Sequence, residues 1–144
     1  MIKNLAIASD HAGYNLKNFI LNNLKNEINL KDFGTDSDKS CDFPDFAKQV
    51  CEFVISSESS KGLLICGSGV GMSIAANKVK GIRAANVINA KTAKQSVEHN
   101  DVNVLCLGSK NVNENNCLSI IESFLNSEFI QEERYIRRIS KLEH

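Results

Sequence analysis

Residues 63–78 read LLICGSGVGMSIAANK, and this stretch decides the fold. Its first four residues form an apolar run that is typical of a strand covered on both faces. Three glycines, Gly67, Gly69 and Gly71, then alternate with other residues, and residues 70–78 have the spacing of a helix. A strand that enters a helix through a glycine turn is the repeating unit of an α/β protein.

The same alternation of strand and helix extends along the whole chain. The predicted strands are residues 4–9, 28–34, 62–66, 82–87 and 102–108. The predicted helices are residues 16–24, 44–54, 70–78, 90–100, 113–126 and 129–142. Strands that alternate with helices form a parallel sheet with helices on both faces. The sequence therefore predicts a three-layer αβα fold, Rossmann-like, with a five-stranded parallel sheet and a C-terminal helix.

Composition and charge limit the classes of partner. The chain has 144 residues, of which 42% are hydrophobic and 24% charged, as is ordinary for one globular domain. Its formal net charge of zero gives no general attraction to nucleic acid or to a membrane surface. No apolar run approaches the roughly 20 residues of a membrane span. We therefore expect neither a nucleic-acid nor a membrane partner.

The cysteines indicate the compartment. The five cysteines are odd in number and never spaced as CxxC, which argues against a disulfide framework or a zinc site. We expect a cytoplasmic protein that binds no metal. Residues 142–144, LEH, resemble the start of an expression tag, so we expect a single domain over residues 1–141.

The functional edge of the sheet follows from the fold. In parallel sheets, ligands bind beyond the carboxyl ends of the strands, where the winding direction switches. The residues that follow the predicted strands are 9–11, 34–36, 66–69, 89 and 108–110. Polar residues and glycines are concentrated there. We expect His11 and His99 to lie near this edge.

The glycine turn after Cys66 is built to hold negative charge. It lacks the GK[ST] of a nucleotide-binding P-loop and the glycine spacing of a dinucleotide fingerprint, so we expect neither ATP nor NAD. Its backbone N–H groups and the following helix dipole suit a phosphate or a reaction oxyanion. Cys66 beside it could be a reactive thiolate or a packed core residue, and its local sequence favours packing.

Other polar residues also permit two interpretations. Asp10 follows the first strand and could cap the next helix or bind a ligand, and His11 stands beside it. Arg134 and Arg138 are four apart, hence on one helical face. They could bind a phosphate or form a solvated basic surface.

Five segments, in order, carry a resemblance to a known family. They are SDHAG (9–13), DFPDFA (42–47), GLLICGSGVGMSIAANKVKGIRAA (62–85), EHNDVNVLCLGS (98–109) and RYIRRI (134–139). The chain resembles the ribose-5-phosphate isomerase B family of sugar-phosphate isomerases, which also includes galactose-6-phosphate isomerase subunits. The resemblance covers nearly the whole chain and changes the interpretation of Cys66 from a packed residue to a catalytic base.

The resemblance implies that ribose 5-phosphate and ribulose 5-phosphate, of the pentose phosphate pathway, are interconverted through a cis-enediolate without a metal or organic cofactor. Cys66 matches the base, His99 the acid/base that opens the sugar ring, and Asp10 a carboxylate that assists at the sugar hydroxyls. The matching anion hole consists of the N–H groups around Gly67, Ser68, Gly69 and Gly71. The matching substrate and phosphate contacts are His11, Asn100, Arg134 and Arg138.

The resemblance also implies a homodimer or a dimer of dimers in which two subunits share each site. The C-terminal helix, apolar at Ile130, Ile136 and Ile139, could make that contact.

Four positions depart from the family's usual residues. Ser68 stands in place of a threonine, and Phe43 in place of a tyrosine. Tyr135 replaces a frequent histidine, and Lys110 keeps the charge of a phosphate-binding arginine without its fork. These departures leave open a six-carbon sugar phosphate as substrate, and a non-catalytic sugar-phosphate-binding module is the alternative from another class.

Overall fold

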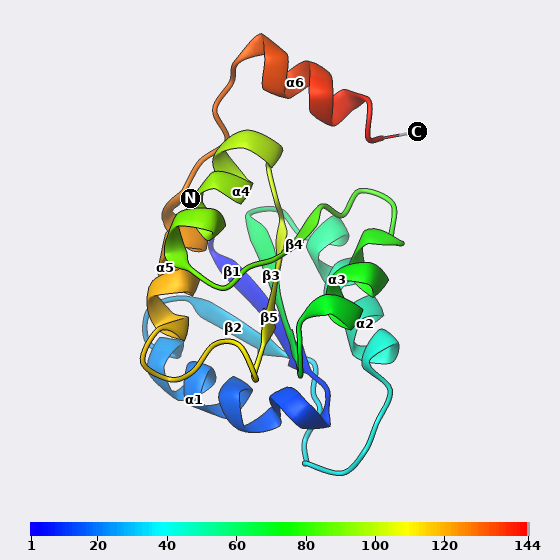
Figure 1. Ribbon diagram of the computed structural model, residues 1–144, viewed down its shortest axis with the longest axis vertical. Coiled ribbons are helices and arrows are strands. Elements are labelled where there is room, and N and C mark those ends of the chain that lie inside the picture. The colour runs from blue at the N-terminus through cyan, green and yellow to red at the C-terminus, as the bar shows by residue number, and fades with distance from the viewer. Residues whose placement is uncertain (144) are drawn as a thin grey trace.

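Five parallel strands form one sheet in the computed structural model, which describes residues 1–143 (Figure 1). The strands are β1 (Asn4–Ser9), β2 (Asn29–Asp32), β3 (Ser60–Cys66), β4 (Ala84–Asn86) and β5 (Val104–Gly108). Their order across the sheet is β2-β1-β3-β5-β4. His144, the last residue of the expected tag remnant at 142–144, lies outside the described residues.

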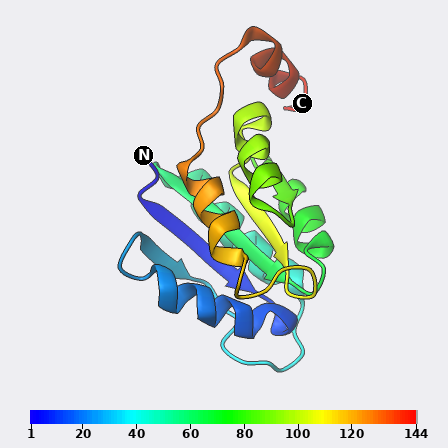
Figure 2. The same ribbon diagram turned by 60° about the vertical axis from the view of Figure 1, so that its left-hand side comes forward.

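Helices cover both faces of the sheet. They are α1 (Tyr14–Leu24), α2 (Phe43–Ser56), α3 (Val70–Asn77), α4 (Ala90–Asn100), α5 (Cys117–Asn126) and α6 (Glu133–Ser140). Helices α1, α4 and α5 pack on one face and α2 and α3 on the other, while α6 extends beyond the sheet (Figures 1 and 2). The three-layer αβα prediction is confirmed. Within residues 1–143, no helix combines the length and the apolar composition that a membrane crossing requires.

Alternation along β3 divides the core into two clusters. Leu63 and Ile65 are fully buried beneath α1, α4 and α5, whereas Leu64 packs beneath α2 and α3. Cys66 lies on the side of Leu64, because successive side chains of a strand point to opposite faces. Its thiol therefore faces α3, the helix that follows it in the chain.

The strand order sets the position of a ligand site. The chain passes from β1 to β2 on one side and then crosses to β3 on the other side of β1. The carboxyl ends of β1 and β3 are neighbours, with Ser9 paired to Ile65. The crevice at such a switch point is where open α/β sheets bind ligands. Asp10 and Cys66 follow directly at this point.

Two helices begin later than the sequence predicts. Helix α5 begins at Cys117 and not at residue 113, because the Asn113 side chain accepts the Asn115 N–H at 2.9 Å and the Asn113 N–H bonds to the Asn116 side chain at 2.9 Å. Such local bonds compete with helix formation. Helix α6 begins at Glu133 and not at residue 129, since residues before it are extended and the Ile130 N–H bonds to the Glu98 carbonyl of α4 at 3.0 Å.

Candidate active site

The thiol of Cys66 lies at the centre of the glycine turn between β3 and α3. Its side chain is 5% exposed, and the Gly69 N–H donates to Sγ at 3.1 Å. Gly69 has φ +80°, a left-handed conformation that favours glycine. A Cβ at this position would also collide with the Asn86 amide oxygen. Both constraints make glycine necessary at the point where the turn contacts the sulfur.

The turn that follows the thiol also carries N–H groups without a hydrogen-bond acceptor within residues 1–143. Among the described residues, no acceptor takes the backbone N–H of Gly67, Ser68 or Gly71, while the Val70 N–H donates to Ser68 Oγ at 3.2 Å. These donors stand at the positive end of the α3 dipole. The turn can therefore hold an oxyanion beside Cys66. The Phe43 ring covers Gly71, where an added Cβ would lie 2.9 Å from its carbon atoms.

Asp10 and His11 approach the turn from the end of β1. Asp10 is 7% exposed, and its Oδ1 accepts the N–H groups of Ala12 at 2.9 Å and Gly13 at 3.1 Å, so the capping interpretation is confirmed for this oxygen. His11 Nδ1 accepts the Cys41 N–H at 3.3 Å. In the neutral ring this bond leaves the proton on Nε2, which can donate to a ligand.

Lys110 brings a cation to the turn from the end of β5. Its Cε and Nζ lie 3.6 Å and 3.8 Å from the position that a Cβ on Gly67 would occupy. The Lys110 N–H bonds to the Gly67 carbonyl at 3.0 Å, and Ser109 Oγ donates to the Ala12 carbonyl at 2.9 Å. Residues that follow β1, β3 and β5 are thus bound to one another around the thiol.

The other buried thiols are unsuited to act as bases. Burial raises the pKa of Cys51 to about 12, with a further contribution from Glu52. Burial raises the pKa of Cys106 well above its usual value, and it raises the pKa of Cys117 as well. These three side chains remain neutral thiols near pH 7 and keep the packing role that their sequence contexts favour.

A second group of predicted site residues lies on α4 and α6. The ring of His99 stacks on Tyr135, with centroids 4.6 Å apart and planes inclined by 16°. Arg134 also lies over the Tyr135 ring, with its guanidinium carbon 4.7 Å from the centroid, and its Nη2 donates to the phenol oxygen at 3.0 Å. Asn100 and Arg138 are exposed nearby on the same two helices.

The expectation that His99 lies near the carboxyl edge is wrong. Helix α4 begins after β4 and returns to the start of β5, so its last turn, with His99, lies at the amino edge (Figure 1). Four residue steps from Val104 to Gly108 separate the two edges, or roughly 13 Å at about 3.3 Å per residue. Within one chain, the structure does not bring His99, Arg134 and Arg138 to Cys66.

Sequence reasoning missed two amides beside the turn. The carbonyl of Ser68 accepts Asn86 Nδ2 at 3.2 Å and Asn111 Nδ2 at 3.3 Å. Asn86 is the last residue of β4, whereas the predicted strand extends to residue 87 and places Asn89 at the edge. Asn89 caps α4 by accepting the Thr92 N–H at 2.8 Å. The signal for Asn86 is its place directly after the small apolar pair Ala84-Ala85, where β4 ends.

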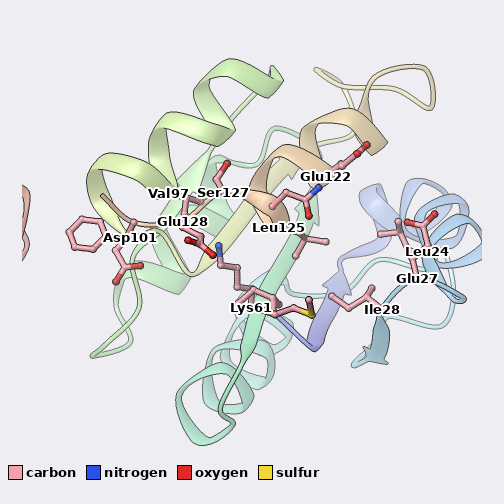
Figure 3. Close-up of a pocket in the computed structure, with 14 residues that line it drawn as sticks. Leu24, Glu27, Ile28, Lys61, Val97, Asp101, Glu122, Leu125, Ser127 and Glu128 are labelled. Carbon is pink, nitrogen blue, oxygen red and sulfur yellow. The ribbon is translucent and has the colours of Figure 1, made fainter. Parts of the chain in front are cut away.

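A cavity of about 690 Å³ lies at the amino edge of the sheet (Figure 3). Leu24, Val97 and Leu125 line it together with the acidic side chains of Glu27, Asp101, Glu122 and Glu128. Lys61 is 7% exposed there, and its ammonium donates to the Phe124 carbonyl at 3.1 Å. Burial lowers the pKa of Lys61 to about 8, and Asp101 partly opposes this change. The Cys66 site contributes no residue to the cavity.

Lys61→Met is expected to raise the free energy of unfolding at pH 7 by about 1–3 kcal/mol. This range allows for the hydrogen bond to the Phe124 carbonyl that the variant loses. The unfolded chain binds the proton more tightly than the folded chain, so burying the charge destabilises the fold below pH 8. This penalty is relieved as pH rises from about 8 toward the unfolded value of 10.5. Urea unfolding of the wild type and of Lys61→Met at pH 7 and pH 10 measures the difference in unfolding free energy at each pH. Lys25→Met, at an exposed lysine, is the control. The same change in unfolding free energy for Lys61→Met at both pH values would contradict the prediction.

An open parallel sheet with a thiol, a turn of N–H donors and a cation at its switch point defines an α/β protein whose carboxyl edge is suited to a phosphorylated or oxyanionic ligand. The sequence profile of the ribose/galactose isomerase family matches residues 5–142. The chain belongs to this family and is a sugar-phosphate isomerase.

Individual relatives support the same assignment. Ribose-5-phosphate isomerase B of Escherichia coli is 40% identical over 129 residues, which are 89% of this chain and 87% of that protein. The structure of Clostridium thermocellum ribose-5-phosphate isomerase B has a TM-score of 0.93 at 46% identity, covering 97% of this chain and 95% of its own. The Mycoplasma genitalium enzyme with bound ribulose 5-phosphate has a TM-score of 0.90 at 43% identity, covering 99% and 95%.

Proposed function

We propose that the chain interconverts ribose 5-phosphate and ribulose 5-phosphate, a step of the pentose phosphate pathway, with Cys66 as the base. The observation that carries this proposal is the Cys66 sulfur, which accepts the Gly69 N–H at 3.1 Å beside the free N–H groups of the turn. The bound ribulose 5-phosphate of the Mycoplasma genitalium relative supports the choice of substrate.

The reaction moves a carbonyl from C1 to C2 of the open-chain sugar. The Cys66 thiolate removes the C2 proton, and the electron pair of that bond forms the enediolate while negative charge develops on O1. The N–H groups of Gly67, Ser68 and Gly71 stabilise this charge. The thiol then returns a proton to C1, and the O2 proton moves to O1. One thiol performs both transfers because C1 and C2 are adjacent.

The remaining polar residues divide between ring opening and substrate binding. In this proposal His99 opens the furanose ring as acid and base, and Asp10 and Ser68 assist at the sugar hydroxyls and the developing oxyanion. The substrate and its phosphate are bound by His11, Asn100, Lys110, Arg134 and Arg138. Charge-assisted contacts of this kind are stronger than neutral hydrogen bonds.

We propose that two copies of the chain complete each other's sites. Within one chain, His99 and Arg134 lie at the opposite sheet edge from Cys66. A single copy therefore does not bring all the proposed catalytic and substrate-binding residues into one site. A groove of about 500 Å³ between α2 and α3 is lined by Phe43, Pro44, Ile74, Ala75 and Val79, and Phe43 reaches the glycine turn. The exposed Ile136 of a partner's α6 matches this apolar surface.

Deuterium exchange tests substrate and mechanism together. Ribose 5-phosphate is incubated with the protein in heavy water, and proton NMR follows loss of the C2 proton. The proposal predicts exchange at C2 and formation of ribulose 5-phosphate labelled at C1. Exchange with galactose 6-phosphate or allose 6-phosphate, and none with ribose 5-phosphate, would establish a six-carbon substrate and overturn the pentose assignment.

We propose that the reaction needs no metal or organic cofactor, since one base and fixed N–H donors supply both the proton transfer and the charge stabilisation. Turnover is expected to be unchanged after dialysis against EDTA. Loss of activity that a divalent cation restored would contradict this. We further propose that residues 1–141 act as one isomerase domain in the cytoplasm, whose reducing conditions suit the five free thiols.

A further inference from the structure

The peptide between Ser68 and Gly69 joins the thiol to two side chains outside the turn. Its N–H donates to Cys66 Sγ at 3.1 Å. Its carbonyl accepts two amides, Asn86 Nδ2 at 3.2 Å and Asn111 Nδ2 at 3.3 Å. Asn86 ends β4 and Asn111 follows β5, so the two amides reach the carbonyl from separate segments. Neither amide bonds to the sulfur.

The orientation of this peptide decides what the thiol faces. Gly69 has little steric resistance to a change of φ, so the peptide plane could rotate without a clash of its own side chain. Rotation would point the Ser68 carbonyl, which carries partial negative charge, toward the sulfur and the anion site. It would also remove the Gly69 N–H that stabilises a thiolate. Two donors on the carbonyl oppose this rotation.

The same two bonds strengthen the donor. A carbonyl that accepts hydrogen bonds polarises its peptide group, so the N–H at the other end becomes a better donor. Asn86 and Asn111 are both exposed, and hydrogen bonds at exposed positions contribute little to the stability of a fold. Their effect on the sulfur is therefore separable from their effect on unfolding.

We propose that Asn86 and Asn111 are positioning residues of the isomerase reaction: they hold the Ser68–Gly69 peptide so that its N–H stays on the Cys66 thiolate. This inference rests on the proposed function of Cys66 as the base. Because both amides bind the same carbonyl oxygen, each of them still restrains the peptide when the other is removed. The double variant consequently loses more than the two single variants together.

The test uses Asn86→Leu, Asn111→Leu and their combination, which remove the donors and keep a side chain branched at the same carbon. We expect kcat for ribose 5-phosphate to fall about 3- to 10-fold in each single variant and by more than the product in the double variant, as about one hydrogen bond each implies. KM should stay within about 2-fold, because the phosphate contacts are unchanged. Asn115→Leu, an exposed asparagine of the same segment, is the matched control.

Alkylation of Cys66 by iodoacetamide at pH 7 measures thiolate reactivity without any substrate. Peptide mass spectrometry follows Cys66, with Cys41 as the internal reference. We expect Cys66 to react several-fold more slowly in the Leu variants, and Asn86→Asp to be slower than Asn86→Leu. Asp keeps the shape of the side chain but replaces the donor by an acceptor.

Three results would overturn the inference: Cys66 alkylation equal to that of Asn115→Leu, a fall in unfolding free energy without a fall in reactivity, or a milder effect of Asn86→Asp than of Asn86→Leu. The last two are what a packing role alone predicts. Slower alkylation in a protein that does not turn over ribose 5-phosphate would keep the positioning role and refute the proposed substrate. If the double variant failed to fold, the single variants and Asn86→Asp would still decide the question.

Discussion

Cys66→Ala is expected to lower turnover of ribose 5-phosphate by ~10² to 10⁴-fold, the usual effect of losing a positioned acid/base group. The variant removes the only thiol that accepts an N–H of the glycine turn among the described residues, and with it the base that moves protons between C1 and C2. The fold should persist, because alanine retains the Cβ and the lost sulfur leaves a small void at the mouth of the site. Steady-state kinetics and the deuterium exchange assay measure the loss.

The matched control is Cys51→Ala, which removes a fully buried thiol from the same core cluster. Its raised pKa of about 12 excludes it as a base at neutral pH. This variant should lose some stability and keep turnover near wild type. Turnover of Cys66→Ala within a few-fold of wild type would return Cys66 to the role of a packed core residue.

His99→Asn is expected to slow turnover of ribose 5-phosphate by about 10²-fold, because the furanose ring must open before the proton transfer. Ribulose 5-phosphate has no five-membered ring, since its 5-hydroxyl is phosphorylated. Exchange of its C1 proton in heavy water should therefore survive in His99→Asn and vanish in Cys66→Ala. The overall equilibrium ties the two directions together, so single-turnover exchange is the proper measurement. Equal loss in both variants would place His99 in the enediolate step.

The arginines should give a different kinetic signature. Arg134→Ala and Arg138→Ala are each expected to raise KM by about 10- to 100-fold in both directions, as the loss of a charge-assisted contact implies. Arg137→Ala is the matched control on the same helix, because Arg137 bonds to Glu133 at 2.6 Å and 2.8 Å and has no proposed role. A rise in KM for Arg137→Ala alone would contradict the assignment of the phosphate site.

Local patterns were sufficient to predict most of the fold and one half of the candidate site. The buried strand that ends at Cys66 and the glycines behind it are adjacent in sequence, so their spacing specifies the turn. Asp10 and His11 were found for the same reason, since they follow a strand directly. Lys110 is placed beside Gly67 by the pairing of β3 with β5.

Local side-chain bonds and tertiary contacts decided the features that sequence reasoning missed. The start of α5 depends on side-chain bonds of Asn113, which outweigh its helical spacing. The strand order, and with it the contact of Asn86 and Asn111 on one carbonyl, depends on how distant segments pack. The position of His99 was predictable, because a helix between parallel strands runs back to the amino edge, but the sequence interpretation placed it by its neighbours alone.

Complementation between two inactive variants decides whether two copies of the chain share each site. Cys66→Ala and His99→Asn chains are coexpressed with different affinity tags, and the mixed dimer is isolated through both tags. One of its two sites then has both Cys66 and His99. We expect about half of the wild-type turnover of ribose 5-phosphate for this dimer, while either parent dimer remains nearly inactive. A mixed dimer as inactive as its parents would contradict the shared site.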